Sequence, residues 1–472
     1  MKLLHSNRLF VFFALFLIGC ASRNPTLPAG DYLGLLRFPD ITYRLYINST
    51  NTEFVLMNAT LKAGRFSLDT IYFKNDSLYF RLGEYYSEYK GHYDRTSHRI
   101  TGQWTAEDTT AYILDFFPIK ADTLSGLHPR TSIYNYKPPV QVADGILTNS
   151  LASQQITKAP LDKLMQRITR GRYTDIHSIL IARHDSLVLE EYFYRFDHNY
   201  IYNIQSATKS IVSALTGIAI ARNEIKSVQE TLCASLPAYK ELACNDQNKE
   251  ITLQQLLTMS TGIPWDEQTY DYIDARNSAA IAANEKDQFI YLLSLPRVKS
   301  ASPVFAYNSL NHTLMNAVLR NATKLENKQE LTDRLLKPLG IENSYIGEPT
   351  PMGAIGDIGL RPRDMLKFGL LYIHEGRWNQ QQLIPAQWVK ESTTPKIHPT
   401  STLGYGYFWW TRNFRWKEKT VASFFAWGYG GQYIIVIPEV DLVVVMSGSH
   451  WGTDPESQMV DIVEEVLSAV EP

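Results

Sequence analysis

Residues 205–210 read Gln-Ser-Ala-Thr-Lys-Ser, and residues 211–220 continue as Ile-Val-Ser-Ala-Leu-Thr-Gly-Ile-Ala-Ile. The apolar run predicts a buried helix that begins near Ser206. Ser206 and Lys209 are three residues apart, so a helix places their side chains on one face, one turn apart. A desolvated lysine can be neutral and accept a hydroxyl proton, which makes this pair a candidate activated nucleophile. The alternative is structural, with Ser206 as a helix cap and Lys209 in its first turn.

A second Ser-x-x-Lys sequence, at Ser87 to Lys90, provides an internal comparison. Its neighbours alternate between apolar and polar residues, which predicts a strand. On a strand the side chains of Ser87 and Lys90 point to opposite faces and do not form a pair. The motif alone is therefore a weak signal, and its setting decides what it means.

The composition is that of a globular protein long enough for two or three domains. Of the 472 residues, 44% are hydrophobic and 20% are charged, and the net charge is −2. No basic run or stripe indicates a nucleic-acid partner. The 28 tyrosines and 9 tryptophans would fit carbohydrate or peptide-like ligands, but we favour β-rich packing as the reason for them.

The N-terminal residues have the pattern of an export signal. Lys2 and Arg8 form a positive start, and the apolar run that follows is too short to span a bilayer. Residues 17–20, Leu-Ile-Gly-Cys, resemble a bacterial lipobox, in which Cys20 becomes the lipidated first residue of the mature chain. An ordinary signal peptide with an incidental cysteine is the alternative. Ala21 follows the cysteine in place of an Asp that would indicate inner-membrane retention, and no later segment is apolar enough to cross a membrane.

Two further cysteines, Cys233 and Cys244, have ten residues between them. In an exported protein such a pair favours a disulfide that closes a small loop. Two unpaired buried thiols are the alternative. We expect a bridge that acts as a structural staple.

The patterns divide the chain into four parts: a signal peptide at 1–20, a small all-β barrel-like domain at 25–119, a linker at 120–149 and the main domain at 150–472. The β domain is expected from alternating runs such as 43–47, 77–82 and 111–116. We see no chemistry in it and expect a structural or interaction module.

The main domain is predicted to be α+β. Its expected elements are a helix at 151–168, a hairpin at 177–192, a helix from 251 that ends at Gly262, a helical middle to about 337, core strands at 433–438 and 441–446, and a helix at 454–470. This order indicates one sheet assembled from both ends of the domain, with a helical insertion.

A serine–lysine pair needs a second proton-handling group and an oxyanion hole. Tyr307, in Tyr307-Asn308-Ser309, is a candidate for the first, because a tyrosine near an ammonium can act as a general acid or base. The second candidate is the glycine-rich sequence 426–431, Ala-Trp-Gly-Tyr-Gly-Gly, where an edge strand would offer N–H groups to a substrate. A core tyrosine and a tight turn are the respective alternatives.

In this order the pieces resemble the penicillin-recognising serine hydrolases, and most closely their class C β-lactamase-like branch, which includes D,D-peptidases, esterases and 6-aminohexanoate-dimer hydrolases. The resemblance covers roughly residue 149 to the C-terminus, and three further stretches share it, at 256–262, 359–365 and 405–410. It implies the β-lactamase/D,D-peptidase-like fold, an antiparallel sheet flanked by helices plus a helical subdomain.

The resemblance also implies roles. Ser206 would attack a carbonyl, and Lys209 would accept its proton or hold the charge of the hydrogen-bond network. Tyr307 would pass a proton to the leaving group. The backbone N–H groups of Ser206 and Tyr429 would form the oxyanion hole, with Ser206 at a helix N-terminus that favours developing negative charge.

Two departures bear on the substrate-binding residues Ser309, Trp427 and Gly428. Ser309 stands where many members carry Asn, which weakens a hydrogen bond to substrate or to Lys209. Ala426-Trp427-Gly428 replaces Lys/His-Thr-Gly, so Ala426 offers no charge to a substrate carboxylate. This favours an uncharged ester or amide over penicillins and D-Ala-D-Ala peptides.

The sequence therefore predicts a serine esterase or amidase that works through a Ser206 acyl-enzyme and needs no metal or organic cofactor. The alternatives are a β-lactamase or D,D-peptidase and, in another class, a catalytically silent envelope binding protein. No Gly-x-Ser-x-Gly elbow supports a Ser-His-Asp hydrolase, and His312 and His450 are expected to be loop or supporting residues. The expected partners are a small ester, amide or peptide-like substrate and a membrane reached through the lipid anchor, at the periplasmic side of a bacterial outer membrane.

Overall fold

The computed structural model describes residues 27–37, 42–49, 54–58, 68, 70–82, 87–105, 110–119, 134–169, 172–173, 175–193, 196–270, 274–298, 300, 302–347, 355–356, 358–449 and 455–472. The predictions for Cys20 and His450 fall outside these residues.

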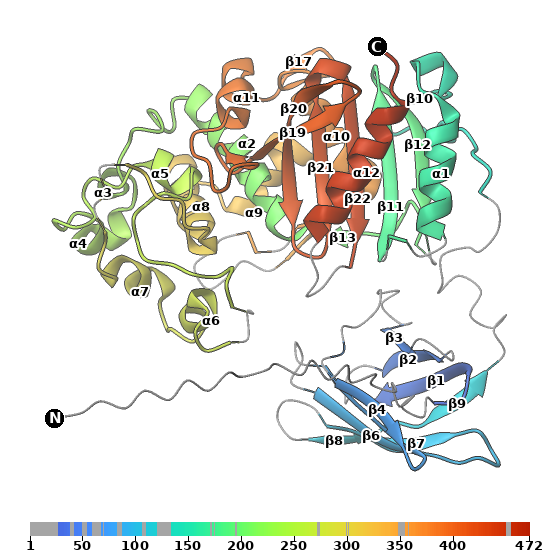
Figure 1. Cartoon of the computed structure of the whole chain (residues 1–472). Helices are drawn as coiled ribbons and strands as arrows, with labels where there is room; N and C mark the ends of the chain where they lie inside the picture. The colour runs from blue at the N-terminus through green and yellow to red at the C-terminus, as the bar shows by residue number, and fades with distance from the viewer. Residues whose placement is uncertain are drawn as a thin grey trace, which may run out of the picture.

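The N-terminal region is β-rich, as its alternating sequence predicts (Figure 1). The described strands are β1 (Gly30–Arg37), β2 (Thr42–Ser49), β3 (Phe54–Asn58), β4 (Thr70–Lys74), β5 (Ser77–Leu82), β6 (Ser87–Tyr93), β7 (Ile100–Thr105), β8 (Ala111–Ile113) and β9 (Phe116–Ile119). They form one antiparallel sheet in the order β3-β2-β1-β9-β7-β6-β5-β4, with β8 on β7. Leu78, Phe80, Tyr89 and Phe116 belong to its own buried core. The expected run 111–116 is two strands, because the chain leaves the strand conformation at Leu114 and Asp115.

The second Ser-x-x-Lys lies on β6, as predicted. Ser87 is 5% exposed, whereas Lys90 is exposed and forms an ion pair with Glu88. The side chains of Ser87 and Lys90 point to opposite faces of the strand, so they do not form a pair.

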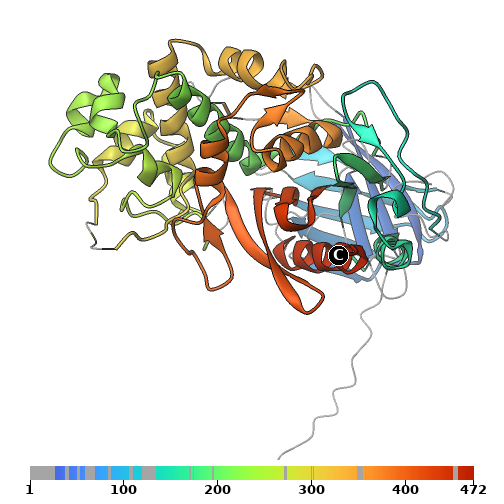
Figure 2. The same cartoon turned by 90° about the horizontal axis from the view of Figure 1, so that it is seen from above.

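A second antiparallel sheet forms the centre of the rest of the chain (Figures 1 and 2). Its order is β10-β12-β11-β22-β21-β20-β19-β18, so the first hairpin pairs directly with the last strand, as expected of a sheet built from both ends. The strands are β10 (Leu147–Thr148), β11 (Ile176–Arg183), β12 (Ser186–Tyr192), β18 (Gly404–Tyr405), β19 (Trp410–Trp416), β20 (Lys419–Gly428), β21 (Gln432–Ile437) and β22 (Leu442–Gly448). In β11, β21 and β22 every residue is buried, because helices cover both faces of the sheet.

One face carries α1 (Lys158–Thr169) and α12 (Pro455–Ala469), and the other carries α2 (Thr208–Ala221) and α10 (Pro362–Ile373) (Figure 2). The helical insertion lies beside α2 and contains α3 (Leu232–Ser235), α4 (Lys240–Ala243), α5 (Leu253–Leu257), α6 (Ser278–Ala283), α7 (Gln288–Ser294), α8 (Ser309–Thr323) and α9 (Asn327–Leu331). A disulfide joins Cys233 in α3 to Cys244 just after α4. Among the described helices, none is long and apolar enough to cross a membrane.

Two predicted helix boundaries are wrong. The helix that begins after Thr252, whose side chain and Gln255 form a capping box, ends at Leu257 and not at Gly262. The chain turns instead at Met259, whose φ is +54°, and the Met259 carbonyl accepts a hydrogen bond from the distant Ala306 N–H at 2.8 Å. Residues 151–157 are not part of α1 either, because a short 3₁₀ turn at 152–154 precedes it.

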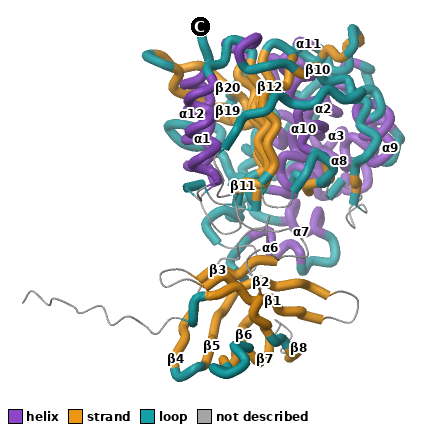
Figure 3. The backbone as a smooth tube through the Cα atoms, turned by 90° about the vertical axis from the view of Figure 1, so that its right-hand side faces the viewer, coloured by secondary structure: helices purple, strands orange, loops and turns teal. Residues whose placement is uncertain are grey.

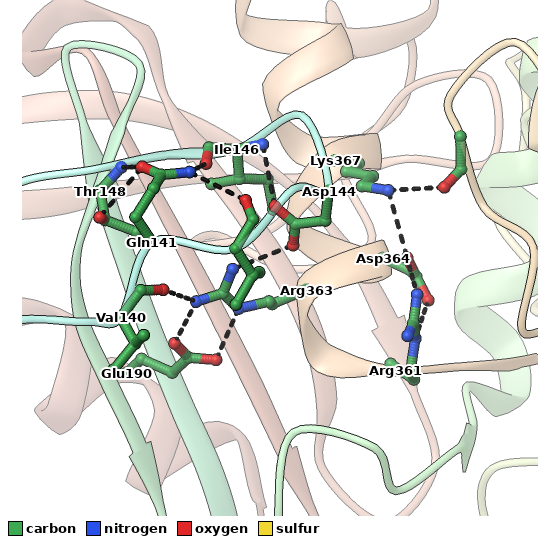
Figure 4. Close-up of polar contacts among 12 residues, drawn as sticks. Val140, Gln141, Asp144, Ile146, Thr148, Glu190, Arg361, Arg363, Asp364 and Lys367 are labelled. Carbon is green, nitrogen blue, oxygen red and sulfur yellow. Dashed lines mark hydrogen bonds and ion pairs between the residues drawn. The ribbon is translucent and has the colours of Figure 1, made fainter.

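The segment 134–149 is fastened to the sheet by one buried arginine (Figure 4). Arg363, at the start of α10, forms two hydrogen bonds to Glu190 of β12, at 2.8 and 2.6 Å. It also donates to Asp144 at 3.0 Å and to the Val140 carbonyl at 2.9 Å. The segment expected to be a linker thus contributes β10 as a parallel edge strand on β12.

We expect Arg363→Ala to lower the free energy of unfolding by about 3 kcal/mol, because it leaves the largely buried carboxylates of Glu190 and Asp144 without their cation. Urea denaturation followed by circular dichroism measures the change. The matched control is Arg415→Ala, since the Arg415 side chain is 74% exposed where it pairs with Glu464. Arg415→Ala should lower the free energy of unfolding by less than about 1 kcal/mol. Equal decreases in the two variants would contradict the role given to Arg363.

Candidate active site

Ser206 lies in a single 3₁₀ turn, η4 (Gln205–Ala207), that leads straight into α2. Gln205 has a φ of +52°, a left-handed conformation that is uncommon for a residue with a side chain. The turn is held by the Gln205 N–H, which donates to the Asn203 side chain at 2.9 Å, and by the Ile204 N–H, which donates to the Ile358 carbonyl at 2.9 Å. The backbone is therefore bent sharply at the candidate nucleophile, and the bend is fixed by a neighbouring strand.

Lys209 is one turn further on and lies beside Ser206, as the spacing predicts. Its Nζ is 3.0 Å from the Ser206 Oγ, and the side chain is buried at 6% exposure while Ser206 is half-buried. Burial lowers the pKa of Lys209 to about 8, against an opposing effect of the Glu267 charge. A large fraction of this amine is therefore neutral in mildly alkaline solution, where it can accept a proton.

Tyr307 lies against the same amine. The Lys209 Nζ is 5.0 Å from the centre of the Tyr307 ring, and the Tyr307 hydroxyl interacts with Ser206. Burial is the main cause that raises the pKa of Tyr307, with the Glu267 charge second, so its hydroxyl keeps its proton at neutral pH. Tyr307 is positioned by Asn308, which caps α8 by accepting the Leu310 N–H at 2.8 Å.

Ser309 links Lys209 to a residue that the sequence analysis did not single out. The Ser309 Oγ is 3.4 Å from the Lys209 Nζ and donates to the Glu267 carboxylate at 2.7 Å. Glu267 is 2% exposed and also accepts the Ser309 N–H at 2.9 Å and the Trp265 indole N–H at 2.7 Å. The only cue in the sequence is an acidic residue shortly after Gly262, in a loop without periodicity.

The C-terminal end of β20 forms a local sheet edge beside the nucleophile turn. Pairing of β20 with β19 reaches only Phe425, whereas pairing with β21 continues to Gly428. A Cβ atom on Gly428 would lie 2.1 Å from the Ile204 carbonyl oxygen, so only glycine permits this approach of strand and turn. Tyr429, the next residue, is 42% exposed.

Aromatic rings extend from Tyr307 to this strand end. Trp410 stacks on Tyr307 with ring centres 6.0 Å apart, and it contacts Trp427 at 5.4 Å. Trp427 in turn stacks on Tyr433 at 5.8 Å. Ala426 is 1% exposed and, by strand alternation, shares the face of Gly428 toward the nucleophile turn. The face that meets the turn thus carries the Ala426 methyl group, and aromatic rings extend from Tyr307 to the end of the strand.

The structure therefore brings Ser206, Lys209, Tyr307 and Ser309 together and places Gly428 against the turn that carries Ser206. The Cys233–Cys244 disulfide lies elsewhere, among the short helices of the insertion. The arrangement combines a serine hydroxyl, a buried amine, a protonated phenol and a strand edge, which together would suit acyl transfer.

Comparisons with known proteins agree with this fold. The Beta-lactamase family model matches residues 176–464. Protein flp of Staphylococcus aureus (strain MW2) is 30% identical over 146 residues, which make up 30% of this chain and 27% of that protein. The chain thus spans about a quarter of the length of this relative. An uncharacterized protein of Alkalihalophilus pseudofirmus is 22% identical over 313 residues, or 58% of this chain and 84% of that protein.

Two solved structures share the fold. A Bacillus anthracis protein described as a 6-aminohexanoate-dimer hydrolase has a TM-score of 0.53 at 19% identity, covering 72% of this chain and 88% of that one. The octameric penicillin-binding protein homologue from Pyrococcus abyssi has a TM-score of 0.53 at 18% identity, covering 67% and 78%. At these identities the likeness concerns the fold alone.

The contact of Gly428 with Ile204 makes Gly428→Ala a sharp test of the site. The added methyl group should push strand and turn apart and slow the labelling of Ser206 by a fluorophosphonate at least about tenfold. The measurement is a labelling time course with mass spectrometry of the Ser206 peptide. Gly30→Ala is the control, because the nearest atoms to a Cβ there lie at 3.4 Å. An unchanged labelling rate in folded Gly428→Ala would show that the close approach does not matter.

Proposed function

The chain belongs to the β-lactamase family, and on this premise we propose that it is a serine hydrolase that cleaves an uncharged ester or amide through a Ser206 acyl-enzyme. The observation that carries the proposal is the buried Lys209 amine at 3.0 Å from the Ser206 hydroxyl. Hydrolysis through a serine nucleophile requires a base within hydrogen-bonding distance of the serine hydroxyl, and the pKa of this base should be near the working pH.

In the first half-reaction, the Ser206 Oγ bonds to the substrate carbonyl carbon while Lys209 takes the hydroxyl proton. The electrons of the carbonyl double bond move to the oxygen, which would lie between the N–H groups of Ser206 and Tyr429. Tyr307 then passes its hydroxyl proton to the leaving group as the bond between that group and the carbonyl carbon breaks, and Lys209 returns the proton it took to Tyr307. Water attacks the acyl-enzyme in the second half-reaction, with the proton following the reverse path to release Ser206 and a carboxylic acid.

The residues expected to contact the substrate favour a substrate without a charged group. Ala426 places a methyl group where members of the family carry Lys or His, so no cation is offered there to a substrate carboxylate. Trp427 is half-buried against Trp410, and it supplies an aromatic surface for an apolar acyl or alcohol group. Family members act on small amides or esters, and these two residues favour the uncharged ones among them.

Two alternatives have their own readouts. A β-lactamase or D,D-peptidase would turn over nitrocefin at a rate comparable to an ester. A silent binding protein would form no covalent adduct with a fluorophosphonate. The combination of Ser206, Lys209 and Tyr307 argues against the silent protein, because a binder has no use for a nucleophile with a buried base.

We expect hydrolysis of a short-chain p-nitrophenyl ester, and a loss of at least about 10³-fold in kcat for Ser206→Ala, because the variant has no nucleophile. Initial rates and the mass of the acylated Ser206 peptide are the measurements. The matched control is Ser87→Ala, at the serine of the second Ser-x-x-Lys, which should keep full activity. Undiminished turnover by Ser206→Ala would refute the mechanism.

We also infer that the protein is exported and anchored through a lipid on Cys20, at the periplasmic side of a bacterial outer membrane. Support comes from the positive start, the short apolar run and the lipobox-like residues 17–20. The full chain, expressed in a bacterium that processes lipoproteins, should partition into the detergent phase of Triton X-114 and carry a diacylglyceryl group. Cys20→Ser should lose both properties, and a mature wild-type chain without lipid would refute the anchor.

A further inference from the structure

Glu267 is a buried acidic residue two hydrogen bonds away from the base of the proposed reaction. It lies in the loop after α5, whereas Ser309 begins α8 and Lys209 lies in α2. The three side chains form a continuous path, from Lys209 to the Ser309 Oγ at 3.4 Å and on to Glu267 at 2.7 Å. Nothing in the proposed mechanism so far uses this carboxylate.

The direction of the hydrogen bonds gives Glu267 a role. A serine hydroxyl has one proton, and that of Ser309 is donated to Glu267. The lone pairs of the Ser309 oxygen therefore face Lys209, which donates one of its N–H groups to them. A neutral amine oriented in this way keeps its own lone pair available for the hydroxyl of Ser206.

We propose that Glu267 is a positioning residue that acts through Ser309 to orient Lys209 as the base for Ser206 and to stabilise the ammonium ion that Lys209 becomes. The proposal rests on the serine hydrolase function argued above. When the Ser206 Oγ bonds to the electrophile, its proton moves to Lys209, and the Ser309 hydroxyl then links the new positive charge to a carboxylate already in place. No reorganisation is needed to stabilise it.

The other titratable groups near Lys209 are neutral, so they do not offset the effect of the Glu267 charge on the pKa of Lys209. Burial raises the pKa of Tyr307, and burial raises that of Tyr405 well above its usual value, so both phenols stay neutral. On α8, burial and then the Lys209 charge hold the pKa of His312 well below its usual value, so this ring is neutral too. Among the described residues around the amine, Glu267 is the group that raises the pKa of Lys209 against burial.

Glu267 is also secured independently of Lys209. The Trp265 indole and the Ser309 N–H each donate to its Oε2, at 2.7 and 2.9 Å. A carboxylate held by three donors is a rigid acceptor, so the orientation that it imposes on the Ser309 hydroxyl is fixed before a substrate binds.

The experiment uses the full chain and follows the rate of fluorophosphonate labelling of Ser206 against pH. Because the pKa of Lys209 is about 8, the wild-type rate should rise as the pH increases through about 8. Glu267→Gln removes the charge that raises this pKa, so the rising limb should move to lower pH by about one unit. The rate on its upper plateau should fall about tenfold, because the amide orients Ser309 less strictly and does not stabilise the ammonium ion.

Two variants keep the test decisive. Ser309→Ala breaks the path but leaves the charge of Glu267, so p-nitrophenyl ester turnover should lose about tenfold in kcat with little change in KM, and the pH limb should stay in place. Glu330→Gln removes another buried carboxylate, one that pairs with Arg334, and should leave the limb unmoved. Circular dichroism confirms folding in each case.

An unmoved limb and plateau in folded Glu267→Gln, or full kcat in Ser309→Ala, would overturn the proposal for Glu267 while leaving a Ser206 hydrolase intact. Failure of the proposed function looks different, because the wild-type chain then forms no adduct on Ser206 at any pH.

Discussion

The burial of the Lys209 amine is the constraint on which the site depends. In water a lysine is a cation and does not accept a proton from serine. Here α2 is buried from Thr208 to Ala219, between the sheet and the helical insertion, so the amine lies where its charged form is disfavoured. The same sequence motif on β6 has no such setting, since Lys90 is exposed and bound to Glu88. The two motifs share the serine and the lysine at the same spacing, and the packing around them makes the difference.

Much of the fold could be predicted because its elements have a clear period. The hairpin β11–β12 and the strands β21 and β22 follow from short apolar runs between turns, and α2 follows from its apolar length. The boundary at Gly262 could not be predicted in this way. The helix ends early because Met259 turns to bind Ala306 across the insertion, and such a tertiary bond leaves no local trace in the sequence.

The candidate site was predictable to the same extent. Ser206, Lys209 and Tyr307 carry recognisable spacing, but Glu267 approaches them from a loop between α5 and α6 that has no periodic pattern. The strand edge was predicted from its glycines, and it is an edge only over the last residues of β20, since β19 pairs with the rest. Where a strand loses its partner is a matter of register, which composition does not reveal.

The sheet joins β11, near the start of the main domain, to β22, near its end. Figure 3 shows the sheet as one layer, with α1 and α12 on one side and α2 and α10 on the other. Ser206 and Lys209 are synthesised early, but Trp410, Gly428 and the strands behind them come some two hundred residues later. A fold dominated by such distant pairings forms slowly, since the long loop has to close before its contacts stabilise it. Before β20 packs against the turn that carries Ser206, part of the structure around Lys209 is missing, and a lysine exposed to water is an ordinary cation. In the hydrolase proposed above, the base would therefore be complete only once the last strands of the sheet are in place.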